Sequence, residues 1–148
     1  MQPPKILPPH YFVICVLIQI VVAWVYEPKL ANHWITWVGV LPMLAGLGVA
    51  VRASIQFRKA ETNIIPLTES STLVVDGAFS FSRNPMYLGM LCFLSGLALA
   101  LDAWPNWIVV LTFYLIIMRQ FILKEEQLMQ QTFADEYLQY QDNVRRWL

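Results

Sequence analysis

Four apolar runs divide this sequence, at residues 8–26, 34–52, 85–101 and 104–123. A helix needs roughly 17 to 25 mostly apolar residues to cross the hydrocarbon core of a bilayer, and each run is about that long. Over the whole chain 57% of residues are hydrophobic and 14% are charged, which excludes a soluble domain of ordinary composition. The sequence therefore predicts an all-α, polytopic membrane helix bundle with four transmembrane helices in a single domain, residues 1–148.

The distribution of charge predicts how these helices are oriented. Four spans place nine of the ten Lys and Arg residues on one side of the membrane and Lys29 alone on the other. Because cytoplasmic segments are enriched in Lys and Arg, both termini and the long loop 53–84 are predicted to be cytoplasmic. The nine residues are Lys5, Arg52, Arg58, Lys59, Arg83, Arg119, Lys124, Arg145 and Arg146.

The residues after the fourth run are predicted to form a cytoplasmic amphipathic helix over 124–146. Apolar side chains recur there at spacings of three and four, which places them on one helical face. Such a helix either lies on the membrane surface or packs on the bundle. The apolar positions are Met129, Phe133, Tyr137, Tyr140, Val144 and Trp147.

Cysteine and histidine usage indicates neither a disulfide nor a metal site. Cys15 and Cys92 both fall inside apolar runs, where each is expected to be a small buried hydrophobe. His10 and His33 lie near opposite membrane edges, so we do not expect them to bind one metal ion. A net charge of zero gives no indication of nucleic-acid binding.

Two short polar segments lie at the cytoplasmic ends of apolar runs. The first, at 83–89, reads Arg-Asn-Pro-Met-Tyr-Leu-Gly, and Pro85 suits the first turn of a helix because no N–H is needed there. The second, Lys-Glu-Glu at 124–126, lies just beyond the fourth run. We predict that the two segments face each other across one pocket at the cytoplasmic mouth of the bundle.

Each residue in these segments also has a simpler structural interpretation. Glu125 and Glu126 suit the positive end of a helix dipole. Arg83 and Tyr87 suit a membrane interface, and Asn84 suits a helix N-cap. These interpretations explain the residues one at a time, but they do not explain their order and spacing together.

The order and spacing resemble the isoprenylcysteine carboxyl methyltransferase and phospholipid methyltransferase superfamily. The resemblance extends over 62–146 and consists of 83–89, the preceding Leu73-Val74, the following Glu125-Glu126, and 133–140. It implies an integral membrane methyltransferase with S-adenosyl-L-methionine entering from the cytosol and a lipophilic small-molecule acceptor arriving from the bilayer. By position it implies cofactor contacts at Leu73, Val74, Phe79, Asn84, Pro85, Tyr87, Glu125 and Glu126, positioning of the reactants by Asn84, Tyr87 and Glu125, and substrate contacts at Arg83 and Arg119.

Two positions depart from the superfamily members that methylate prenylcysteine. Those members carry a His where this chain has Ser71, and an Arg four residues before the cofactor-contacting Glu, where this chain has Phe121. That Arg orients a substrate carboxylate, so its absence argues against carboxyl methylation. Arg119 is near, but a shift of two positions turns it to a different side of the helix. The identity of the acceptor, and whether O, N or S is methylated, stays open.

Methyl transfer from a sulfonium is an in-line displacement that depends mainly on alignment, which can lower a barrier by roughly 7 to 11 kcal/mol. Aromatic faces such as Phe79 and Tyr87 can stabilise the sulfonium by roughly 0.5 to 2 kcal/mol. No nucleophilic side chain is required, so we predict no covalent intermediate.

Two other functions remain open. One is a lipid or sterol reductase that uses NADPH. The other is a non-catalytic membrane module, for instance a homo-oligomer, assembled through small-residue faces that let helices approach closely. The small residues are Gly46 and Ala50 in the second run with Ser54 just beyond it, and Cys92, Gly96 and Ala100 in the third.

Overall fold

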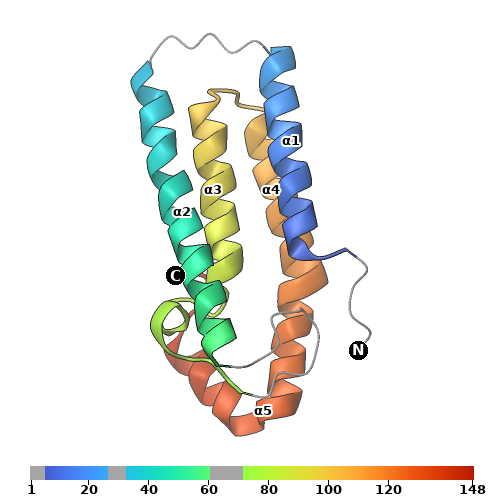
Figure 1. The fold of residues 1–148 in the computed structure, drawn as a ribbon. Helices are drawn as coiled ribbons and strands as arrows, with labels where there is room; N and C mark the ends of the chain where they lie inside the picture. The colour runs from blue at the N-terminus through green and yellow to red at the C-terminus, as the bar shows by residue number, and fades with distance from the viewer. Residues whose placement is uncertain (1–5, 27–32, 61–71) are drawn as a thin grey trace.

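The computed structural model describes residues 6–26, 33–60 and 72–148, and every regular element in that part of the chain is helical (Figure 1). Helix α4 runs through a π-helical segment, η2, directly into α5, and a short 3₁₀ turn, η1, precedes α3. The elements are α1 (Pro8–Tyr26), α2 (His33–Lys59), η1 (Gly77–Ser80), α3 (Pro85–Ala100), α4 (Asn106–Ile117), η2 (Met118–Ile122) and α5 (Leu123–Asn143).

Within the described residues, three helices are long and apolar enough to cross a membrane, which makes this an integral membrane protein. They are α1, the part of α2 at Thr36–Lys59, and the continuous helix Asn106–Asn143 that comprises α4, η2 and α5. Helix α3 is apolar but has 16 residues. At 1.5 Å per residue it spans roughly 24 Å, less than the roughly 30 Å of a hydrocarbon core. The all-helical class is confirmed, whereas four complete spans remain a prediction.

The limits of α1 and α3 agree with the sequence to within one residue, but α2 is longer than predicted. It continues through Lys59 instead of ending at 52. The added turns remain helical because Ala53 and Phe57 pack against apolar neighbours on the inner side of the helix. The predicted loop 53–84 is correspondingly shorter, and its residues 61–71 lie outside the described part of the chain.

The fourth run continues without interruption into the predicted C-terminal helix. Helix α4 begins at Asn106 instead of 104, and the helix does not stop at 123. Helix α5 bends at Ala134, whose φ of 44° and ψ of −118° are not helical, and it ends at Asn143 instead of 146. Beyond the bend, α5 turns back toward the start of α3 (Figure 1).

Glycines bring the backbones of α2 and α3 into direct contact. A Cβ atom added to Gly39 would lie 2.5 Å from the carbonyl oxygen of Gly96, and the reverse substitution would create the same clash. Gly46 and Gly89 face each other in the same way. The two helices lie side by side along the bundle (Figure 1). The small-residue face of α2 therefore meets that of α3 within the chain.

Buried apolar side chains form two clusters. The bundle core lies between α1, α3 and the α4–η2 helix, and its best-buried members are Leu94, Phe113 and Ile117. The end cluster joins α2, η1 and α5 at the end of the bundle. Because α5 contributes to it, the C-terminal helix packs on the bundle, one of the two arrangements that its pattern predicted. The end cluster consists of Ala53, Ala78, Phe79, Tyr137, Tyr140 and Val144.

Candidate functional site

The structure brings the two predicted polar segments into contact. The hydroxyl of Tyr87, in the first turn of α3, donates a 2.7 Å hydrogen bond to Oε1 of Glu125, which is 38 residues away in sequence and in the first turn of α5. Tyr87 is buried. This bond fixes the start of α3 against the helix that continues α4.

The π-helical segment η2 determines which side of the helix faces α3. A π-helix bonds residues i and i+5, so it rotates all later side chains relative to an α-helix. Within η2, Phe121 and Ile122 are buried in the bundle core. Glu125 lies four positions after Phe121 and hence on the same helical face, directed at Tyr87. The rings of Phe121 and Tyr87 have centroids 6.5 Å apart.

Glu125 is a carboxyl group with unusual ionisation. The apolar part of its helix ends at Leu123, so Glu125 lies outside the spanning segment. The pKa of Glu125 is raised to about 7 because burial disfavours its charge; the hydrogen bond from Tyr87 lowers this pKa and the charge of Glu126 raises it. A partly buried carboxyl group whose pKa is raised toward neutrality is typical of functional sites.

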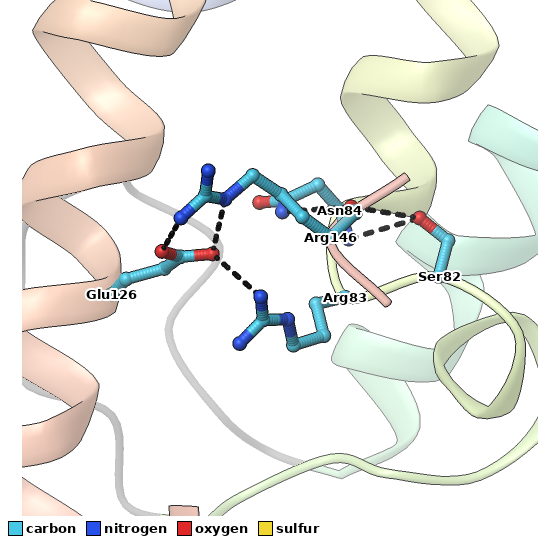
Figure 2. Close-up of polar contacts among 5 residues, drawn as sticks. All are labelled: Ser82, Arg83, Asn84, Glu126 and Arg146. Atoms are coloured by element: carbon cyan, nitrogen blue, oxygen red, sulfur yellow. Dashed lines mark hydrogen bonds and ion pairs between the residues drawn. The ribbon is translucent and has the colours of Figure 1, made fainter. Parts of the chain in front are cut away.

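Glu126 is held by two arginines instead (Figure 2). Arg146 donates through Nε to Oε1 at 2.9 Å and through Nη2 to Oε2 at 2.7 Å. Nη2 of Arg83 lies 3.4 Å from Oε1. The side chains of Glu126 and Arg83 are each 11% exposed, so these two charges are largely shielded from water, whereas the side chain of Arg146 is 35% exposed. A cofactor contact at Glu126 would therefore compete with a bidentate ion pair.

Residues 144–148, which we call the strap, close over the start of α3. The side chain of Asn84 does not cap the helix; its Nδ2 donates to the carbonyl oxygen of Arg146 at 3.1 Å. The hydroxyl of Ser82 donates to the same oxygen at 3.3 Å and accepts the N–H of Asn84 at 3.2 Å (Figure 2). Pro85 occupies the first turn of α3, as the sequence predicted.

Ser82 and Arg146 are site residues that the sequence patterns do not single out. Arg146 counts there only as one of nine charges on one side of the membrane. The available signal is its position between Val144 and Trp147, two residues of the predicted apolar stripe. Val144 is buried in the end cluster and Trp147 packs against the bundle core, so Arg146 is held from both sides.

The remaining predicted cofactor contacts lie in and against the end cluster. Phe79 is buried, its ring makes an edge contact with Phe57 at a centroid distance of 5.0 Å, and its carbonyl oxygen accepts the Tyr140 hydroxyl at 2.6 Å. Leu73 and Val74 are partly buried against the same cluster. The predicted contacts thus form two neighbouring groups, one around the Tyr87–Glu125 bond and one around Phe79.

Arg119 is not brought to the other predicted residues. It is exposed on η2 and forms no hydrogen bond or ion pair with the described part of the chain. Phe121, at the position of the carboxylate-orienting Arg, is 1% exposed and belongs to the bundle core. Ser71 lies outside the described residues. Among the residues that are described, no group of three or more His, Cys, Asp or Glu side chains could hold a metal ion.

Residues 34–136 match the sequence model of the family described as "Phospholipid methyltransferase". An uncharacterized protein of Haemophilus influenzae (strain Rd) is 40% identical over 63 residues, which are 43% of this chain and all of that protein. No solved structure matches. The family match includes both polar segments and stops before the strap.

Proposed function

We propose that this chain, which belongs to the phospholipid methyltransferase family within the isoprenylcysteine carboxyl methyltransferase-like superfamily, moves a methyl group from S-adenosyl-L-methionine to a lipophilic acceptor in the bilayer. The family match and the apolar helices make the protein a membrane methyltransferase. The identity of the methyl donor and the chemical class of the methyl acceptor are what we propose.

The observation that carries the proposal is the Tyr87–Glu125 bond at the polar end of the bundle. A carboxylate has room for about four hydrogen bonds, and Glu125 accepts one from the described residues. Its remaining capacity fits the ammonium group or the ribose hydroxyls of the cofactor. Asn84 and Pro85 shape the neighbouring wall at the start of α3. Leu73, Val74 and Phe79 lie in the adjoining apolar group, suited to an adenine ring.

Alignment of donor and acceptor is the main work of such a site. When bound, S-adenosylmethionine supplies a methyl group on a positively charged sulfur. Glu125 would balance that positive charge once ionised, and Tyr87 would hold Glu125 in one orientation. No described side chain has to act as a nucleophile, so the methyl group passes to the acceptor in one displacement.

The acceptor is proposed to be lipophilic and to reach the site from between the helices. The buried phenyl ring of Phe121 stands where a carboxylate-orienting Arg would be, which disfavours a carboxyl acceptor. Arg83 is the candidate substrate contact, because its Nε and Nη1 are buried without a hydrogen-bond partner among the described residues. Arg119, on the exposed side of η2, is the weaker candidate. The charge asymmetry of the sequence supports a site that opens to the cytoplasm.

Cofactor binding separates this function from its two rivals. S-adenosylmethionine at 100 times its dissociation constant should stabilise the detergent-solubilised protein by about 2.7 kcal/mol and raise its melting temperature. NADPH should not. Incubation with methyl-labelled cofactor and a total lipid extract should then label a lipid. Stabilisation by NADPH alone would favour a reductase, and labelling of only water-soluble acceptors would contradict a lipophilic substrate. The small-residue faces of α2 and α3 pair with each other within the chain. This pairing disfavours a non-catalytic module that would use the same faces for assembly.

A further inference from the structure

The strap ties together elements that are distant in sequence. The carbonyl oxygen of Arg145 accepts the N–H of Arg83 at 3.0 Å, in addition to the two bonds at the oxygen of Arg146. Trp147 lies against Tyr114 of α4, with ring centroids 5.6 Å apart. Residues 144–147 thus contact the start of α3, helices α4 and α5, and the end cluster.

The side chain of Arg146 also balances the charge of a carboxyl group, Glu126, near the start of α3. Glu125 and Glu126 are adjacent, partly buried carboxyl groups in the first turn of α5. The two hydrogen bonds from Arg146 neutralise Glu126, with Arg83 as the second and more distant cation. Without Arg146, the charge on Glu126 would be balanced less completely and would oppose ionisation of Glu125 more strongly.

We propose that the strap completes the cofactor site and that Arg146 is a positioning residue, which holds Asn84 through its backbone and, by neutralising Glu126, lets Glu125 ionise when a cationic ligand binds. This inference rests on the proposed function for the identity of the ligand. The strap lies beyond residues 34–136, the part of the chain that the family model matches.

The charged and titratable groups around Glu125 limit the possible explanations of a pH effect. Tyr87 faces it from α3, and Glu126 and Tyr137 lie on its own helix. Arg83 and Arg146 reach it only by way of Glu126. A change at Arg146 and a change at Glu126 should therefore shift the titration of Glu125 in opposite directions.

The test measures the affinity of S-adenosylmethionine by calorimetry across pH 5 to 9 in the detergent-solubilised full chain. In wild type, affinity should rise with pH as Glu125 ionises. Arg146→Ala should move the midpoint of this rise upward by about one pH unit and weaken binding at pH 7 several-fold. Glu126→Gln should move the midpoint downward. Arg58→Ala, which removes an exposed arginine of α2, is the charge-matched control and should leave the midpoint in place.

A purely structural strap would lower stability in both site variants without moving either midpoint, and that result would overturn the proposal. If Arg146→Ala does not fold, Arg146→Lys keeps the charge and Glu126→Gln still tests the sign. If the wild type does not bind S-adenosylmethionine, the proposed function fails. The role of Arg146 is then decided without ligand, from the pH dependence of the melting temperature, in which the same opposite shifts are expected.

Discussion

The hydroxyl oxygen of Tyr87 lies 2.7 Å from Oε1 of Glu125 and donates a hydrogen bond to it. Both residues are in the first turn of their helices, α3 and α5, and both follow a structural irregularity: Pro85 before Tyr87, and the π-helical η2 before Glu125. These two features therefore serve to bring one buried hydroxyl and one partly buried carboxyl group together. Cofactor binding should depend on this pair.

Tyr87→Phe should weaken S-adenosylmethionine binding about tenfold while the protein still folds. A hydrogen bond to a charged group contributes roughly 1.5 to 3 kcal/mol, and 1.4 kcal/mol corresponds to a factor of ten. Glu125→Gln should weaken binding at least as much, because it removes the charge that balances the sulfonium. Calorimetry on each purified variant measures the effect.

Tyr11→Phe is the matched control for this pair. The rings of Tyr11 and Tyr87 both lie near Phe121, at centroid distances of 6.0 and 6.5 Å. The hydroxyl of Tyr11, however, donates to Oε1 of Gln120 at 3.2 Å and not to Glu125. Tyr11→Phe should therefore leave affinity unchanged. Equal affinities in wild type, Tyr87→Phe and Glu125→Gln would refute the assignment.

The raised pKa of Glu125 predicts how stability depends on pH. Its value in the folded protein, about 7, exceeds the ordinary 4.5, so the folded state binds more protons than the unfolded state between these values. The free energy of unfolding should be highest below about pH 4.5 and should fall as pH rises through 7, by no more than about 3 kcal/mol. Melting temperatures from pH 4.5 to 8 should show this fall.

Glu125→Gln isolates the contribution of this one group from all other titrations. The difference in melting temperature between wild type and Glu125→Gln should change across pH 4.5 to 7 and level off above it. A difference that is constant over the whole range would show that Glu125 titrates as an ordinary exposed carboxyl group.

Hydrophobic patterning predicted the helices because each apolar run must leave water, whatever its partners are. It placed the end of α2 wrongly, since the rule that charges end a span ignores Ala53 and Phe57, which pack inward beyond Arg52. It also divided α4 from α5, because a change from apolar to polar residues marks a boundary of environment and not a break in the helix. The described chain shows one helix across that boundary.

The contact between the two polar segments was predictable, because Asn84, Tyr87 and Glu125 each belong to a recognisable local pattern. The strap was not predictable, because its bonds to the start of α3 use the backbone oxygens of residues 145 and 146. Every residue type has a backbone oxygen, so the sequence carries no signal for these bonds. The different partners of Glu125 and Glu126 could not be predicted from the sequence either. It depends on which of two adjacent carboxyl groups meets arginine and which meets tyrosine, and this is set by the rotation that η2 introduces.

Two glycines of α2 should respond oppositely to the same substitution. Gly46→Ala should destabilise the protein by more than about 1 kcal/mol, because the new Cβ would overlap backbone atoms of Gly89 and Phe93 in α3. Gly48→Ala should be neutral or stabilising by up to about 1 kcal/mol, since nothing lies within 4 Å of its Cβ position and alanine favours the helix. Thermal unfolding in detergent compares the two. Equal effects would mean that α2 and α3 do not meet at Gly46.

Ala134→Gly should stabilise the protein, contrary to the usual effect of glycine in a helix. Ala134 has φ 44° and ψ −118°, a backbone conformation that glycine adopts readily and alanine only under strain. Relief of that strain should add about 1 kcal/mol, or roughly 2 to 4 °C in melting temperature. Gln130→Gly, at an exposed helical position of α5, should cost about 1 kcal/mol. If both variants lose stability equally, α5 does not bend at Ala134, and the strap would then have no route back to the start of α3.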